Sequence, residues 1–300
     1  MIHCEPNPHE LYFLIRLGDM TVKIVTDSTA DLPLQLTKEL GITIVPVYVR
    51  FGDEVYRDRV DISEDEFYQR LLHDPIHPST TQPSPQDFVD VYRNLARGAN
   101  GIISIHVSSK LSGTYNSALR GKELVEKECP IEVVDSQVVT MGLGLLAIVA
   151  NTIAKSGKSL QQVEEGVKQM IPSVHVLGLL DTLKYLALGG RIGKAQALLG
   201  SVLSVKPMLT IKNGELVPAG RVRSRAKGID MLFDFVRNAV DIQDLAIVYN
   251  TAHDEAQALV GRIGSIFPQE RIRLARLGPA LGVHTGPGIL FVALRGRDLS

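Results

Sequence analysis

The chain has 300 residues, of which 45% are hydrophobic and 22% are charged, and its formal net charge is −1. This composition is typical of a globular protein and excludes the strongly basic character of a general nucleic-acid-binding protein. Two cysteines, Cys4 and Cys129, are too few for a disulfide framework and favour the reducing cytoplasm. The longest nearly apolar run, residues 142–150, is well short of the roughly 20 residues that cross a bilayer, so no integral membrane segment is expected.

The first half of the chain alternates between short β-branched runs and helical patterns. Strands are predicted over residues 22–26, 43–49, 101–105 and 131–134. Helices are predicted over residues 34–40, 62–72, 85–96, 113–126 and 136–154. Ser63 and Glu66 are expected to form a capping box at the start of the second helix. This alternation is typical of a mostly parallel open sheet with helices on both faces, which binds ligands beyond the carboxyl ends of its strands.

The second half has a different pattern. Helices are predicted over residues 160–170, 182–188, 193–202 and 255–266. Strands are predicted over residues 174–179, 206–211, 215–220, 245–250, 272–277 and 288–294. Asn213-Gly214 between two of these strands is a strong hairpin signal.

These elements predict the α/β fold class, with two α/β domains over residues 20–157 and 158–300 and a ligand cleft between them. The first domain would hold a mostly parallel open sheet, and the second a mixed sheet with a helical hairpin. Residues 1–19 precede the first predicted strand and are interpreted as an N-terminal extension.

Several familiar catalytic patterns are discounted. The segment GLGLLA at residues 142–147 fits a dinucleotide-binding pattern, but it lies inside the helix predicted to begin at Ser136, where small residues serve close packing. No serine has the G-x-S-x-G context of a hydrolase nucleophile. His73 and His77 are separated by Pro75, which spoils the helix that would aim both at a metal ion. Neither a metal nor a cofactor is therefore expected.

Three segments rich in hydroxyls and glycine are placed where a strand should end. They are TDSTADLP at residues 26–33, SSKLSGTYNSA at 108–118 and HTGPG at 284–288, and they are supported by PSTTQP at 78–83, in a loop after the helix predicted over 62–72. Neutral donors in such numbers suit a single carboxylate better than a polyphosphate, which would call for a cationic clamp.

Each segment also has a purely structural interpretation. Asp27 and Asp31 are typical of helix caps and turns, while the neighbouring Ser28 and Thr29 could line the ligand cleft. Ser112 and Gly113 stand at the start of a helix, where free N–H groups favour an anion, although every helix needs a cap there.

His284 is framed by glycines and a proline, so we expect it on a shaped turn and not on the apolar face of a helix. That setting favours a functional histidine over a structural one. Arg191 follows Gly189-Gly190, which is typical of a helix end. This arginine either holds the predicted helical hairpin together or faces a partner.

Five segments in order resemble the DegV family of bacterial proteins: IVTDSTADLP, TTQPSP, SSKLSGTY, LKYLALGGRIGKAQALLGSVLSVKPML and HTGPG. The resemblance covers residues 22–294. That family is similar to the fatty-acid-binding subunits of bacterial fatty acid kinase. Those subunits hold a long acyl chain in a tunnel between two α/β domains and present its carboxyl group to a separate ATP-dependent kinase subunit.

The resemblance implies that Thr80, Ser112 and His284 bind the carboxylate of a long-chain fatty acid. It implies supporting cleft roles for Ser28, Thr81 and Gly113. At Thr81 the family commonly has serine, so the hydroxyl is retained. Arg221, Arg223 and Arg225 are candidates for contacts with the kinase or with the new phosphate.

Simple energetics agree with a lipid ligand. Burial contributes about 0.8 kcal/mol per methylene, so about fifteen methylenes gain on the order of 12 kcal/mol before the costs of binding. Two rival functions remain open at this point. One is a serine esterase or acyltransferase with Ser112 as nucleophile and His284 as base, although no residue is nominated to orient the histidine. The other is a small-molecule sensor that binds a different acid.

Overall fold

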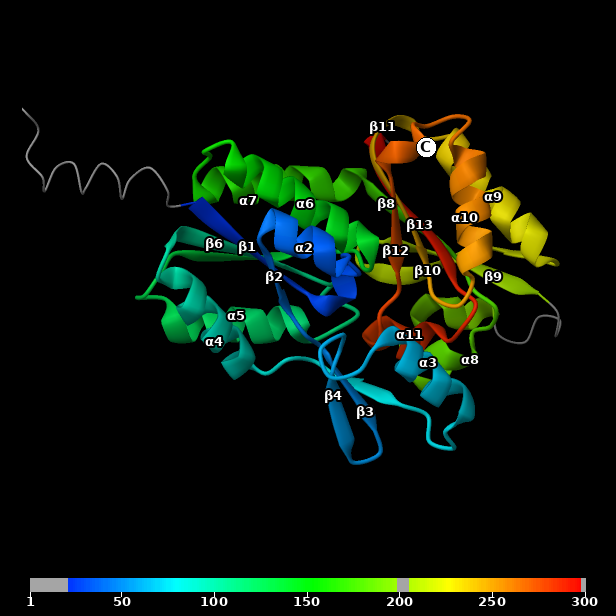
Figure 1. The fold of residues 1–300 in the computed structure, drawn as a ribbon, viewed down its shortest axis with the longest axis horizontal. Coiled ribbons are helices and arrows are strands. Elements are labelled where there is room, and N and C mark those ends of the chain that lie inside the picture. The colour runs from blue at the N-terminus through cyan, green and yellow to red at the C-terminus, as the bar shows by residue number, and fades with distance from the viewer. Residues whose placement is uncertain (1–20, 199–204, 298–300) are drawn as a thin grey trace, which may run out of the picture.

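The computed structural model describes residues 21–198 and 205–297, and the chain folds around two main β-sheets (Figure 1). The first sheet has the order β2-β1-β6-β7, and all its strands are parallel. Its strands are β1 (Thr21–Asp27), β2 (Ile42–Val45), β6 (Ala99–His106) and β7 (Ile131–Asp135). Helix α2 (Leu34–Leu40) joins β1 to β2. One face is covered by α4 (Pro85–Ala96) and α5 (Thr114–Val125), and the other by α6 (Met141–Lys155) and α7 (Leu160–Met170).

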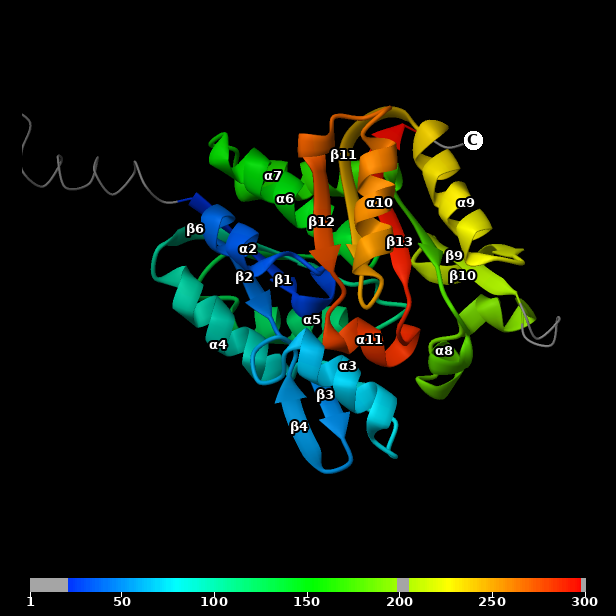
Figure 2. The same ribbon diagram turned by 45° about the vertical axis from the view of Figure 1, so that its right-hand side comes forward.

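The second sheet is mixed, with the order β10-β9-β8-β13-β11-β12 (Figure 2). Its strands are β8 (Val174–Leu179), β9 (Lys206–Lys212), β10 (Glu215–Val222), β11 (Val240–Tyr249), β12 (Ile272–Arg276) and β13 (Leu290–Arg297). The pair β11–β12 is parallel and the other neighbours are antiparallel. Helices α9 (Arg225–Arg237) and α10 (His253–Ile263) pack on one face. The predicted α/β fold class, with a parallel and a mixed sheet, is confirmed.

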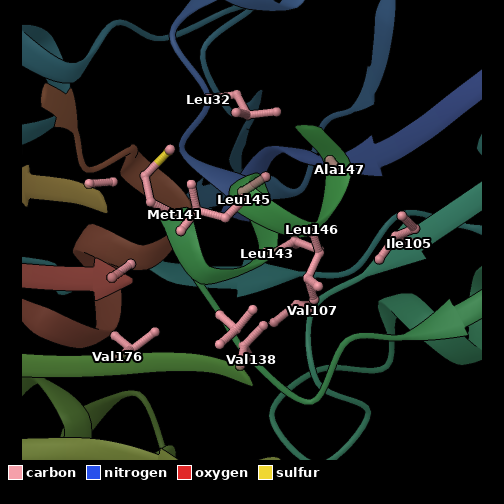
Figure 3. Close-up of a cluster of buried hydrophobic side chains, with 14 of the residues drawn as sticks. Leu32, Ile105, Val107, Val138, Met141, Leu143, Leu145, Leu146, Ala147 and Val176 are labelled. Carbon is pink, nitrogen blue, oxygen red and sulfur yellow. The ribbon is translucent and has the colours of Figure 1, made fainter. Parts of the chain in front are cut away.

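Helix α6 lies between the two sheets and is buried on nearly all sides (Figure 3). It begins at Met141 and not at Ser136 as predicted, because Gln137 and Thr140 adopt positive φ angles of 56° and 53°. The close-packing interpretation of its glycines holds. A Cβ on Gly142 would lie 2.8 Å from Val176 Cγ2, and one on Gly144 would lie 2.7 Å from the Ala30 carbonyl oxygen.

A small antiparallel sheet projects beside the two larger ones and has the order β4-β3-β5. It comprises β3 (Tyr48–Phe51), β4 (Glu54–Arg57) and β5 (Ser79–Thr81), and α3 (Glu64–His73) packs nearby. The single strand predicted over 43–49 is wrong: the chain breaks at Pro46, which lacks an N–H group for the ladder, and β2 and β3 join different sheets. Ser63 caps α3 by accepting from the Glu66 N–H at 3.2 Å, but among the described residues the Glu66 side chain does not return the bond that the predicted capping box requires.

Two helices were not predicted. One is α9, and the other is α11 (Pro279–Thr285), which contains His284 in its last turn. The expectation that His284 sits on a turn outside any helix is therefore wrong. Helix α8 covers Lys184–Leu188. Where a helix was predicted over 193–202, the structure has a 3₁₀ segment, η3 (Gly193–Leu198). Residues 199–202 of that prediction lie outside the described residues.

Three further 3₁₀ turns are η1 (Ser28–Ala30), η2 (Ile171–Ser173) and η4 (Gln269–Arg271). Within the described ranges, none of the helices combines the length and the apolar character that a bilayer span requires. Residues 1–19 lie outside the described residues, and the predicted boundary near residue 157 stays a prediction.

Candidate functional site

An apolar cavity lies where the two sheets meet α11, with an empty volume of about 900 Å³, part of it open to solvent. The first sheet contributes the loops after its strands, and the second sheet contributes β8, β9 and β13. Its apolar wall includes Val107, Val139, Val176, Leu180, Leu209 and Phe291. The polar wall includes Thr29, Thr80, Ser112, Arg191, His284 and Thr285. The cavity therefore suits a molecule with an apolar body and a small polar group.

Thr80 and His284 meet at this cavity although β5 and α11 are far apart in the sequence. Thr80 Oγ1 lies 2.9 Å from His284 Nε2. Burial lowers the pKa of His284 to about 4, and the nearby charges of Arg191 and His77 act in the same direction. The imidazole is therefore neutral at pH 7 and presents a hydrogen-bonding group without a charge.

Gly189 makes room for the His284 ring. A Cβ at this position would collide with Nδ1 of the histidine. The buried Nδ1 has no hydrogen-bond partner among the described residues. The ring is thus held by packing on one side and by Thr80 on the other, which fixes the direction of Nε2.

Ser112 reaches the cavity from the turn before α5. Its Oγ lies 2.9 Å from Thr114 Oγ1 and accepts from the Thr114 N–H at 3.3 Å. Gly113 is the N-cap residue of α5, and a Cβ there would lie 2.6 Å from Gln82 Nε2. Gly113 therefore supports the site indirectly, by letting Gln82 pack against the turn that carries Ser112.

Thr29, and not Ser28, lines the cavity at the end of β1. Ser28 Oγ instead accepts from the Val47 N–H at 3.0 Å and so holds the loop between β2 and β3. Thr29 donates from its N–H and its hydroxyl to Asp27 Oδ1, at 3.1 and 2.5 Å. The sequence offered both Ser28 and Thr29 as cleft residues, because both follow the strand and only the turn η1 decides which one faces inward.

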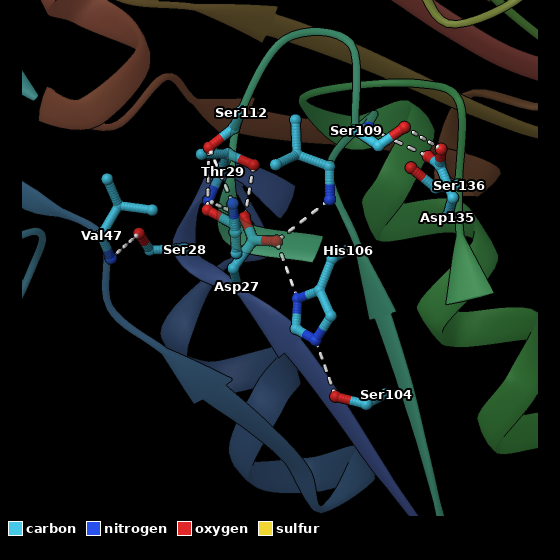
Figure 4. Close-up of polar contacts among 12 residues, drawn as sticks. Asp27, Ser28, Thr29, Val47, Ser104, His106, Ser109, Ser112, Asp135 and Ser136 are labelled. Atoms are coloured by element: carbon cyan, nitrogen blue, oxygen red, sulfur yellow. Dashed lines mark hydrogen bonds and ion pairs between the residues drawn. The ribbon is translucent and has the colours of Figure 1, made fainter. Parts of the chain in front are cut away.

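Behind Thr29, a fully buried polar chain runs into the first sheet (Figure 4). Asp27 Oδ2 lies 3.0 Å from His106 Nδ1, and His106 Nε2 lies 2.7 Å from Ser104 Oγ. Tyr92 donates to the same Ser104 oxygen at 2.8 Å. These contacts satisfy groups that would be costly if left unpaired. They fix Thr29 and do not involve Ser112.

Ser112 and His284 do not form the hydrogen-bonded pair of a serine nucleophile and its base. The hydrogen-bond partner of Ser112 Oγ is Thr114, and that of His284 Nε2 is Thr80. Among the described residues, no carboxylate bonds the histidine ring to orient it. Likewise, within the described ranges no three His, Cys, Asp or Glu side chains gather as a metal site would require.

The remaining predicted residues lie elsewhere. Thr81 is exposed and follows Thr80 on the opposite face of β5. Arg225 is engaged in ion pairs with Asp181 at 3.0 Å and Glu255 at 2.6 Å. Arg221 and Arg223 are exposed near the end of β10.

The sequence left two roles open for Arg191, holding the helical hairpin together or facing a partner. In the structure Arg191 lines the cavity. It donates to the Gly189 carbonyl at 2.9 Å.

The fold and the cavity together define an α/β protein with a mainly apolar cavity where its two large sheets meet. The chain belongs to the DegV family, because the family model described as "uncharacterised protein, DegV family" matches residues 21–295. A DegV domain-containing protein of Caldanaerobacter subterraneus is 34% identical over 90% of this chain and 98% of its own length. A DegV domain-containing protein of Deinococcus radiodurans is 35% identical over 92% of this chain and 98% of its own.

Solved structures share the whole fold. A DegV family protein from Thermus thermophilus, described by its fatty acid binding, superposes with a TM-score of 0.86 at 35% identity, covering 93% of this chain and 100% of its own. A stearic-acid-binding protein from Eubacterium ventriosum has a TM-score of 0.81 at 29% identity, covering 91% and 98% of the two chains.

Proposed function

We propose that this protein binds a long-chain fatty acid in the apolar cavity, with the carboxylate held by Thr80, Ser112 and His284. The observation that carries the proposal is the cavity itself, which has an apolar wall and a group of neutral donors at one place. The relatives described as fatty acid binding, at 35% and 29% identity, support the same ligand class.

The donors are suited to a carboxylate that must stay reactive. Hydroxyls of Thr80 and Ser112 can donate to it, and the first N–H groups of α5 lie beside Ser112. A neutral His284 adds a hydrogen bond without forming a salt bridge. The carboxylate is then paired, as burial requires, and the cation of the cavity wall, Arg191, is exposed and so does not lock it in a buried salt bridge.

We further propose that the protein is not itself a catalyst and presents the bound carboxylate to a separate ATP-dependent kinase subunit, which forms an acyl phosphate. Such a partner places the protein in the cytoplasm. Exposed Arg221 and Arg223 are the candidates for contact with the kinase or the phosphate. Arg225 is the weakest of the three because Asp181 and Glu255 already engage it.

The direct test is to extract the purified protein and identify bound lipid by mass spectrometry. We expect a stoichiometric fatty acid, reduced in Ser112→Ala and in His284→Ala because each removes a carboxylate contact. Ser265→Ala is the matched control, since this serine is exposed at the end of α10. An empty protein that also refuses added fatty acid contradicts the proposal. Hydrolysis of an acyl ester that Ser112→Ala abolishes contradicts the non-catalytic role.

A further inference from the structure

Two buried carboxyl groups, Asp31 and Asp58, lie below the base of α11, and neither belongs to the cavity wall formed by the described residues. Asp31 ends η1, and Asp58 follows β4. Their exposed fractions are 1% each. Arg59 contacts both Asp31 and the backbone of Arg276, in the second half of the chain.

Asp31 joins several segments. It accepts from the Gly278 N–H at 2.8 Å, from the Thr140 hydroxyl at 2.6 Å and from Arg59 Nη2 at 3.3 Å. Arg59 also donates to the backbone carbonyl of Arg276. The start of α11 is therefore tied to η1, to the first residue before α6 and to the loop after β4.

Asp58 is less well satisfied. Neither of its carboxyl oxygens has a hydrogen-bond partner among the described residues. Ser28 and the Ala280 backbone are the polar groups that face it, together with Arg59 and Asp31. The Gly278 backbone covers it so closely that a Cβ there would lie 3.2 Å from Asp58 Oδ1.

The charges around the pair do not balance when both carboxyls are ionised. Arg59 is the nearby cation, and it shares its charge with Glu64 of α3 at 3.1 Å. Arg276 is paired with Asp65 at 2.6 Å, and the buried Tyr68 hydroxyl of α3 stays neutral because burial raises its pKa. Burial raises the pKa of Asp31 to about 6 and that of Asp58 to about 7, and the charge of Asp31 adds to the rise at Asp58.

We propose that Asp58 is a positioning residue whose proton keeps α11 seated over the Asp31–Asp58 pair, and that loss of this proton loosens α11 and weakens the hold of His284 on the ligand. Ser28, the Ala280 backbone and the shared Arg59 charge only partly offset burial of an ionised Asp58, so the ionised carboxylate needs water. Water reaches it when Gly278 and Ala280, which cover it, move away.

The short length of α11 connects this event to the cavity. The helix has seven residues, with Ala280 near its start and His284 in its last turn. Ala280 and His284 both line the cavity. A shift at the start of α11 therefore displaces the ring from Thr80. The ligand part of this inference rests on the proposed function.

The experiment compares wild type, Asp58→Asn and Asp61→Asn at pH 6.5 and pH 8.5. Asparagine has the shape of a protonated, uncharged aspartate. Asp61 is the matched control because it lies on the same loop, is exposed and bonds Arg57, which lowers its pKa to about 2. Two quantities are measured: the Kd for radiolabelled hexadecanoate, and hydrogen exchange of the α11 amides without ligand, with α10 as the internal reference.

For wild type and Asp61→Asn we expect Kd to be about tenfold weaker at pH 8.5 than at pH 6.5, since one linked proton permits at most about tenfold per pH unit. We expect α11 to exchange faster relative to α10 at the higher pH. In Asp58→Asn both pH effects disappear, and the affinity stays within about twofold of the wild-type value at pH 6.5.

Equal pH dependence in wild type and Asp58→Asn overturns the inference, as does wild-type α11 exchange that keeps a constant ratio to α10. The wild-type exchange measurement gives this answer even if Asp58→Asn does not fold. If no variant binds hexadecanoate at either pH but α11 still loosens above pH 7 in wild type, the proposed function fails. The role of Asp58 in keeping α11 seated then still stands.

Discussion

At the scale of single residues, the hydrogen bond between Thr80 and His284 joins two positions 204 residues apart in the sequence. Both residues are held by elements that do not depend on a ligand: Thr80 by its place in β5, and His284 by packing against Gly189. The polar end of the cavity is therefore formed before any ligand arrives, which reduces the ordering cost of binding.

Thr80→Val removes this hydroxyl while keeping the side-chain shape. We expect fatty-acid affinity to fall by about tenfold to a hundredfold, since a hydrogen bond to a charged group contributes about 1.5–3 kcal/mol. Isothermal titration measures the change. Thr81→Val is the matched control, because Thr81 is exposed on the opposite face of β5. An equal loss of fatty-acid affinity in both variants would show that the Thr80 hydroxyl does not bind the carboxylate.

The stability of the folded state should depend on pH through Asp31 and Asp58. Their pKa values are raised from 3.8 to about 6 and about 7, so the native state binds more protons than the unfolded state between these limits. The stabilisation is complete below pH 4 and is lost as pH rises through 7. Urea unfolding should give a lower free energy at pH 8 than at pH 5.5, with a smaller difference in Asp58→Asn. A free energy that rises over this interval contradicts the assignment.

At the scale of elements, the regular helices were predictable and α11 was not. Helices α4 and α7 have the predicted bounds, because each begins with a serine cap and carries an apolar stripe. Helix α11 contains Gly282 and is followed by Gly286, so local preference opposes it. Tertiary contacts hold it instead: Asp31 bonds Gly278, and Phe67 packs where a Gly282 side chain would lie.

Helix α9 was missed for a different reason. Its first turn follows Ser224 and holds two basic residues, Arg225 and Lys227, and basic residues in this segment favour a contact surface as readily as a helix. In the structure Arg225 instead forms ion pairs inside the protein. The grouping of hydroxyls around a cavity was predictable from their places after strands. The inward direction of Thr29 and the burial of Asp58 depend on turn geometry that residue types do not reveal.

Close packing of α6 gives a prediction for its glycines. Gly144→Ala should destabilise the fold by about 1–3 kcal/mol, because the new methyl group meets the rigid Ala30 carbonyl. Gly261→Ala in α10 is the matched control: open space surrounds it, and alanine should add about 0.5–1 kcal/mol of helix stability. Denaturant midpoints measure both. A stabilising Gly144→Ala would contradict the close approach of α6 to η1.

At the scale of the whole molecule, α6 makes the two large sheets one structural unit. Its buried residues share one core with β1 and β6 on one side and with β8 and β13 on the other. We expect a single unfolding transition in which near-UV and far-UV signals coincide. Hexadecanoate at about a hundred times its Kd should stabilise the whole unit by about 2.7 kcal/mol. Two separate unfolding transitions, of which hexadecanoate shifts only one, would contradict the description of the two sheets as one unit.

The position of β13 has a consequence for how the protein is made. This strand comes after all the other described strands in the sequence, yet it lies in the middle of the second sheet, between β8 and β11. On the ribosome, the sheet stays split until β13 has emerged. Phe291 of β13 also forms part of the cavity wall. A chain truncated before β13 therefore has no closed cavity, and a ligand of this cavity can be enclosed only after β13 has joined the sheet.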